Sequence, residues 1–120
     1  MQIQLEFGRI VINGVEYRED VVLCGENIVP RPKHLSKHKA KLYGHTPLTR
    51  EEMEHIVALC RDFDAIFIGK GMEGALPIEN DVLEFLRQLS KPIYIDTSPK
   101  IVEMLRGFGG RVLAVIHITC

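Results

Sequence analysis

The chain has 120 residues, 46% of them hydrophobic, and a formal net charge of -1. This length and composition are typical of one globular unit with one core, so we expect residues 1–120 to form a single domain. No apolar run approaches the roughly 20 residues that span a bilayer, and no secretory signal pattern is seen, so we expect neither a membrane partner nor export.

The cysteine and histidine residues also bear on the class of protein. Cys24, Cys60 and Cys120 are odd in number, and none belongs to a C-x-x-C pair. This usage favours reduced thiols in a cytoplasmic protein over a disulfide scaffold or a structural zinc site. His34 and His38 have the i, i+4 spacing of a helical metal pair, but no Asp, Glu or Cys lies close to them. We therefore expect no metal and no cofactor.

One segment has an unusual charge. Between Asn27 and Arg50 lie six of the 15 Lys and Arg residues and no acidic residue, whereas the rest of the chain is acidic. Such a basic segment favours salt-sensitive docking of an acidic partner. Contact with RNA is disfavoured, because Tyr43 is the single stacking side chain in the segment. The candidate partner-binding residues are Lys33, Lys37, Lys39 and Lys41.

In chain order, the first expected elements are strands. Residues 10–17 alternate around Asn13-Gly14, which predicts a β-hairpin because both turn residues need a positive φ. Residues 20–24 predict another short strand, followed by a turn at 25–27. Three prolines and a glycine interrupt residues 30–48, which predicts a long irregular loop.

From Thr49 onward, helical and strand patterns alternate. Thr49 and Glu52 have the T-x-x-E spacing of a capping box, and Ser98-Pro99 has the pattern of a helix cap followed by proline. The α-β-α-β-α-β order, after an N-terminal antiparallel meander, predicts an α/β fold with a mixed central sheet and right-handed crossovers. The expected helices are 50–61, 79–89 and 98–108, and the expected strands are 65–69, 92–96 and 111–120.

The sequence G-x-G-x-x-G at Gly69–Gly74 raises the possibility of nucleotide binding. A dinucleotide loop needs a helix that opens inside the motif and an acidic residue about 20 positions later, a place that Asp96 could fill. The next expected helix instead begins near Glu79, in an acidic first turn that would repel a phosphate.

We therefore favour a tight turn at the glycines, and keep as an alternative a small anion cradled by the loop amides and Lys70. The ends of parallel strands meet at one edge of a sheet. The candidate ligand-binding residues are Gly69, Lys70, Gly71, Gly74, Asp96, Thr97 and Ser98.

The last strand carries His117 and Cys120. Strand alternation places them on opposite faces, and His117 shares its face with Thr119. This arrangement disfavours a cysteine nucleophile with a histidine base, and favours a hydrogen-bonded histidine and a packed cysteine. The direction of this strand relative to the others stays open.

Three segments, "FGRIVINGVEYREDVVL", "FIGKGMEGALPIE" and "IHITC", resemble in their order the Mth-type domain family. The family includes uncharacterised archaeal and bacterial proteins, an adipogenesis-associated human protein and a mitochondrial complex I assembly factor. The resemblance covers nearly the whole chain and implies a single three-layer α/β domain with an extra β layer. It implies no agreed catalytic set. The matching residues are Gly69, Gly71, Met72, Thr97, His117, Thr119 and Cys120.

The sequence contains no convincing acid–base pair, metal set or activated nucleophile, and we assign no catalytic residue. We therefore expect a non-enzymatic binding domain, an assembly or accessory factor for a protein partner. The alternative is a small anion- or nucleotide-binding protein using Gly69–Gly74 and Asp96–Ser98, where Asp96 or His117 could act on a substrate. A second alternative is RNA contact through residues 31–50.

Overall fold

Two separate β-sheets form the framework of the computed structural model, which describes residues 1–120. The first sheet is the expected antiparallel meander, with Asn13 and Gly14 at φ 49° and 84° in its second turn. The second sheet has five strands in the order β5-β4-β8-β6-β7. The strands are β1 (Ile3–Glu6), β2 (Arg9–Ile12), β3 (Val15–Tyr17), β4 (Val21–Cys24), β5 (Asn27–Pro30), β6 (Ala65–Lys70), β7 (Ile93–Asp96) and β8 (Val112–His117).

The five-stranded sheet is mixed. β8 is its central strand and pairs in parallel with β6 and antiparallel with β4. β7 extends the parallel part beyond β6, and β5 pairs antiparallel with β4 at the other edge. The predicted α/β class and the α-β-α-β-α-β order are confirmed, and the last strand is parallel to the other strands of that unit.

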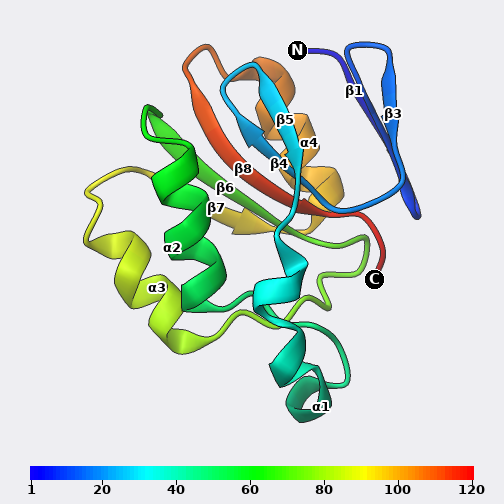
Figure 1. Cartoon of the computed structure of the whole chain (residues 1–120). Coiled ribbons are helices and arrows are strands. Elements are labelled where there is room, and N and C mark those ends of the chain that lie inside the picture. The colour runs from blue at the N-terminus through cyan, green and yellow to red at the C-terminus, as the bar shows by residue number, and fades with distance from the viewer.

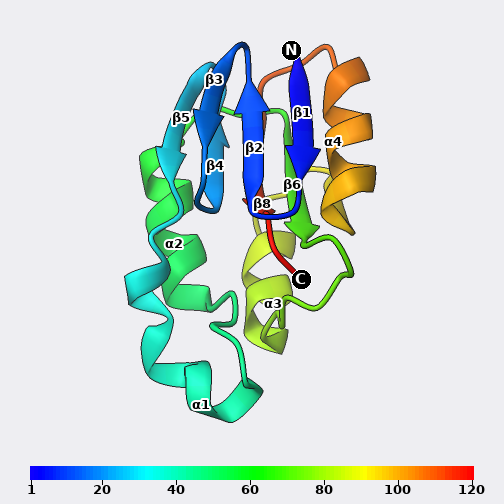
Figure 2. The same ribbon diagram turned by 90° about the vertical axis from the view of Figure 1, so that its right-hand side faces the viewer.

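Helices and the small sheet cover the two faces of the large sheet (Figure 1). The helices α2 and α3 lie on one face, and α4 lies on the other face beside the β1–β3 sheet (Figure 2). The Arg106 side chain of α4 donates to the main-chain oxygen of Ile3 at 2.6 Å, which joins α4 to β1. The helices are α1 (Ala40–Tyr43), α2 (Arg50–Leu59), α3 (Asn80–Arg87) and α4 (Ser98–Gly107).

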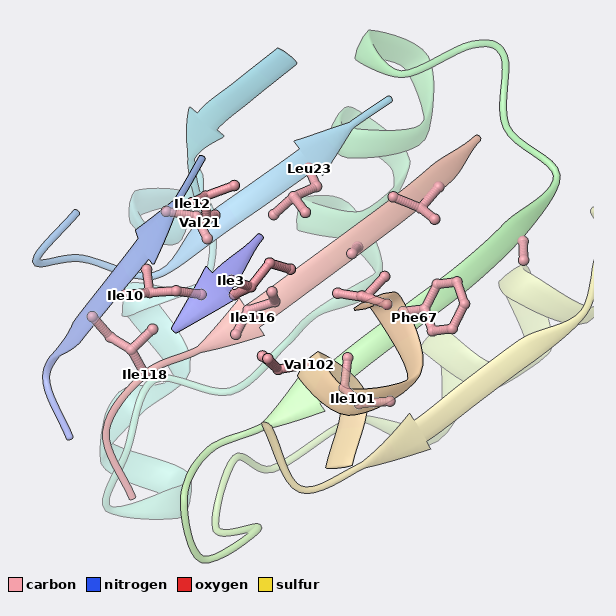
Figure 3. Packing of buried hydrophobic residues seen from close by; sticks show 14 residues of the cluster. Ile3, Ile10, Ile12, Val21, Leu23, Phe67, Ile101, Val102, Ile116 and Ile118 are labelled. Atoms are coloured by element: carbon pink, nitrogen blue, oxygen red, sulfur yellow. The ribbon is translucent and has the colours of Figure 1, made fainter. Parts of the chain in front are cut away.

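Strand alternation divides the core into two clusters. In β6, Ala65 and Phe67 face the meander and α4, while Ile66 and Ile68 face α2 and α3. Figure 3 shows the first cluster, in which Phe67 lies with the isoleucines of the meander and α4. Because both faces of the large sheet are covered, its central strands β6 and β8 are apolar along most of their length rather than alternating with polar residues.

Several features differ from the expectations. The first strand, β1, was not predicted from the sequence. The turn at residues 25–27 is followed by an unpredicted edge strand, β5, which ends at Pro30. Residues 30–48 are not wholly irregular, because two 3₁₀ turns at Lys33–Leu35 and Lys37–Lys39 lead into the short helix α1. Short stretches without a regular apolar repeat can form such turns wherever local i to i+3 hydrogen bonds are available.

The expectation of three reduced cysteines is contradicted, since Cys24 and Cys60 form a disulfide, with Cα atoms 5.1 Å apart, and only Cys120 is free. Spacing in the sequence gave no sign of this pair because the two residues are 36 positions apart. The pair joins the end of β4 to the C-terminal end of α2 and lies beside the α2–α3 cluster of the core.

Candidate functional site

The glycine loop after β6 holds the C-terminal segment of the chain. The amides of Met72, Glu73 and Ala75 donate to main-chain oxygens of Thr119 and Cys120 at 2.7, 3.1 and 3.0 Å. The Gly71 amide donates to Ser98 Oγ at 2.8 Å. The amides that could have cradled an anion are therefore used within the chain.

The other predicted residues near this loop also have internal roles. The sequence predicted Ser98 as the cap of α4, but Thr97 is the N-cap residue. The Ser98 hydroxyl instead donates to the His117 main-chain oxygen at 2.5 Å. Asp96 accepts from the Thr97 amide at 2.7 Å. Gly69 lies so close to Ser98 that a Cβ would meet its Oγ at 2.7 Å, so this glycine permits close packing of β6 and α4.

A buried ionic network lies on the opposite side of the C-terminal segment. The Arg31 side chain has no exposed surface; its Nη1 donates to Asp20 at 3.0 Å and its Nε donates to Glu52 at 2.6 Å. Ser36 Oγ donates to Glu52 at 2.6 Å. Thr49 Oγ1 accepts from the Glu52 amide at 3.3 Å, so only half of the predicted capping box forms.

Arg31 fixes the start of the basic segment. Its Nη2 also donates to the main-chain oxygen of Pro47 at 2.9 Å, so one side chain joins both ends of the segment to β4 and α2. Burial lowers the pKa of Arg31, but its hydrogen bonds and ion pairs with Glu52 and Asp20 outweigh burial and raise it above the usual value. Arg31 is therefore a permanent buried cation between two carboxylates.

Asp20 connects this network to the last strand. His117 Nδ1 lies 2.7 Å from Asp20 Oδ2, and the Ile118 amide donates to Asp20 Oδ1 at 2.9 Å. On the other side of the ring, His117 Nε2 lies 3.2 Å from Thr119 Oγ1. Burial raises the pKa of Asp20, but the contacts with His117, Ile118 and Arg31 outweigh it, so the pKa lies below its usual value.

A pocket of about 480 Å³ opens beside these groups. It lies where the basic segment meets the residues that follow β8, at the carboxyl end of the central strand, a common place for ligands in α/β sheets. Its lining includes five basic residues, counting His34, two acidic residues and Thr119. The lining residues are Arg18, Glu19, Asp20, Arg31, Lys33, His34, Lys37, Ile118 and Thr119.

The structure separates the four lysines that the sequence grouped together. Lys33 and Lys37 line the pocket. Lys39 instead donates to Glu79 at 2.8 Å, and Lys41 lies in α1, outside the pocket lining. Charge pattern alone could not distinguish them, because the local 3₁₀ turns decide which way each side chain faces.

Sequence reasoning missed the acidic and arginine members of the site. Asp20, Arg31 and Glu52 come together from positions up to 32 residues apart, and His117 comes from the far end of the chain. A signal existed for Asp20, since an acidic residue directly precedes the buried strand β4. No group of three or more His, Cys, Asp or Glu residues is arranged to hold a metal ion.

The fold and the site define an α/β protein with a cationic pocket at the carboxyl end of its central strand. The crystal structure of the conserved hypothetical protein PH1505 from Pyrococcus horikoshii OT3 is similar, with a TM-score of 0.85, 29% identity and coverage of 100% of both chains. The structure of MT938 has a TM-score of 0.69 and 30% identity, over 98% of this chain and 96% of its own.

At this identity and coverage, the chain belongs to the same family as MT938. No sequence-family profile and no curated protein matches the chain. The names of the two similar structures state no activity or ligand. None of the helices combines the length and the apolar character needed to cross a membrane.

Proposed function

We propose that this protein is a binding domain that takes an acidic segment of a protein partner at the cationic pocket. The observation that carries the proposal is the placement of Lys33 and Lys37 beside the pocket without a carboxylate partner, while neighbouring Lys39 is paired with Glu79. Unpaired lysines gathered over a concavity attract carboxylates and accelerate association.

The buried network supports this role because it holds the basic wall in place. Arg31 joins the segment to Asp20 and Glu52, so the loop presents its lysines without first having to become ordered. A preorganised site loses less conformational entropy when a partner binds. The resemblance to the Mth-type domain family, with its assembly factor, agrees with an accessory role, and we propose membership of that family.

A small anion is the second candidate ligand. The pocket volume of about 480 Å³ lies in the range of small-molecule sites, which supports a phosphate- or carboxylate-bearing compound. This pocket replaces the glycine loop as the candidate anion site, because the loop amides already donate to main-chain oxygens of the C-terminal segment.

The test uses a fluorescent Glu-rich peptide and the double variant Lys33→Glu/Lys37→Glu. We expect anisotropy titration to show that the variant binds the peptide at least about tenfold more weakly than the unmodified protein. The matched control is Lys41→Glu/Lys100→Glu, which changes the charge equally outside the pocket and should bind as the unmodified protein does. Thermal unfolding shows that each variant is folded.

The same titration with inorganic phosphate and with single-stranded RNA separates the alternatives. Phosphate binding that is lost in the pocket variant, without peptide binding, would favour the small anion. RNA binding that weakens in both double variants would favour a diffuse nucleic-acid surface. Equal peptide affinity in the two double variants would contradict the pocket proposal.

A further inference from the structure

Three side chains beside the pocket form a continuous chain of hydrogen-bonding groups. Asp20 Oδ2 is 2.7 Å from His117 Nδ1, and His117 Nε2 is 3.2 Å from Thr119 Oγ1. The order carboxylate, imidazole, hydroxyl is the order in which a base activates a hydroxyl nucleophile. His117 and Thr119 point to the same side because they are two positions apart at the end of β8.

The contacts of Asp20 determine the tautomer of a neutral His117. Asp20 accepts from Arg31, from the Ile118 amide and from the imidazole, and an ionised carboxylate can only accept. The ring proton therefore lies on Nδ1, and Nε2 is left with a lone pair. The Thr119 hydroxyl then donates to Nε2, which is the direction that nucleophile activation requires.

Burial supports a prearranged group rather than a mobile surface contact. The side chains of His117 and Asp20 are 11% and 7% exposed, while Thr119 reaches the pocket lining. Thr119 and Asp20 thus reach the pocket, whereas His117, which lies between them, is not part of the lining. Lys33, Lys37 and Arg18 also belong to this pocket lining, so the pocket beside Thr119 carries basic residues that attract an anionic ligand.

We propose that Thr119, His117 and Asp20 form an acyl-transfer site that hydrolyses esters, with anionic acyl esters favoured by the basic wall. That preference rests on the proposed function, whereas the reactivity of Thr119 does not. Nothing in this arrangement uses the free thiol of Cys120.

The reaction would proceed in two balanced steps. Thr119 Oγ attacks the ester carbonyl carbon while Nε2 takes its proton; the carbon–alkoxide bond breaks, and the alcohol leaves with that proton. Water then loses a proton to Nε2 and attacks the acyl carbon, which breaks the bond to Thr119 Oγ. The proton returns to Oγ, so that ester and water become acid and alcohol. Asp20 positions the ring throughout.

The experiment treats the full chain with p-nitrophenyl acetate, a neutral ester, and with the p-nitrophenyl monoester of succinate. Peptide mass spectrometry locates the acyl group, and release of p-nitrophenol gives the rate. We expect an acyl group on Thr119 and release that falls about 100-fold in Thr119→Val, the lower end of what a positioned base contributes. Thr119→Ser should retain both the acyl group and release.

The outcomes separate this proposal from the proposed function. Acylation of Thr119 in the unmodified protein by the neutral ester would uphold the acyl-transfer site even if peptide binding fails. Acylation confined to lysines or Cys120, or equal release by Thr119→Val and the unmodified protein, would overturn it while leaving the binding domain intact. Mass spectrometry of the unmodified protein decides the matter even if Thr119→Val does not fold.

Discussion

The Arg31 side chain connects several separate parts of the fold. It is enclosed by Asp20 and Glu52 and also donates to the Pro47 main chain, so its removal would affect β4, α2 and the basic segment together. A buried cation of this kind is not in itself evidence of high stability, because its desolvation opposes its ion pairs. Its loss is nevertheless costly because two carboxylates would stay behind.

We expect Arg31→Met to lower the free energy of unfolding by about 3–5 kcal/mol, since it leaves buried Asp20 and Glu52 without their cation. Urea denaturation at neutral pH measures the change. The control is Arg50→Met, whose partly exposed ion pair with Glu54 at 3.7 Å should contribute below about 1 kcal/mol. Similar losses in the two variants would show that the network does not hold the segment.

The ionisation of Asp20 makes the free energy of unfolding depend on pH in acidic solution. Its pKa is lower in the folded protein than its ordinary value of 3.8, so its contribution is present above that value and is lost as the pH falls through the folded pKa. We expect the free energy of unfolding to fall less between neutral pH and about pH 3 in Asp20→Asn than in the unmodified protein.

Urea titrations at a series of pH values provide this measurement. Asp20→Asn is destabilised at neutral pH, because Arg31 loses a partner, so the test is the slope with pH rather than the absolute value. Glu19→Gln, the adjacent exposed carboxylate, is the control and should keep the slope of the unmodified protein. Parallel curves for Asp20→Asn and the unmodified protein would contradict the prediction.

Among the elements, the connection between the β6–α3 loop and the residues after β8 controls the geometry of Thr119. Gly71 has φ +100°, and a Cβ there would overlap the Cys120 main chain and approach the His117 ring at 2.7 Å. Met72 then binds the Thr119 main-chain oxygen. Gly71, which the sequence placed in a candidate ligand loop, allows this loop and the C-terminal residues to come into contact.

We expect Gly71→Ala to displace residues 119–120 and to reduce stability by about 2–3 kcal/mol, because overpacking adds to the strain of the positive φ. Gly74→Ala is the control: its φ is +74°, but its nearest atom, Thr97 Cγ2, is 3.5 Å away. It should cost about 1 kcal/mol. Urea denaturation of both variants measures the difference, and equal losses would mean that the overlap is relieved without cost.

Elements were predictable where their signals are local. The apolar runs that became β6 and β8, the Asn13-Gly14 turn and the helical repeats of α2, α3 and α4 each depend on neighbours within one or two turns. β5 was missed because its four residues, two exposed and two half-buried, end in a proline and form a strand only through their partner β4. The edge position makes its closing proline tolerable.

The candidate site was less predictable because its contacts are long-range. The Asp20–His117 pair spans 97 residues and the Arg31–Glu52 pair spans 21. Glu52 shows the difficulty most clearly: its spacing from Thr49 indicated a local cap, yet its carboxylate turns to Arg31 and Ser36. His117, Thr119, Lys33 and Lys37 were named from the sequence, but not as neighbours.

For the whole molecule, the position of β8 has a consequence for synthesis. It is the central strand and the one that links β4 to β6, yet it comes last of all the elements. While the ribosome is still making the preceding segments, β4 and β6 have no strand between them, and their apolar residues stay accessible. We therefore expect the five-stranded sheet to form only after residues 112–117 have emerged, so that the apolar faces of β4 and β6 are exposed to aggregation until the end of synthesis.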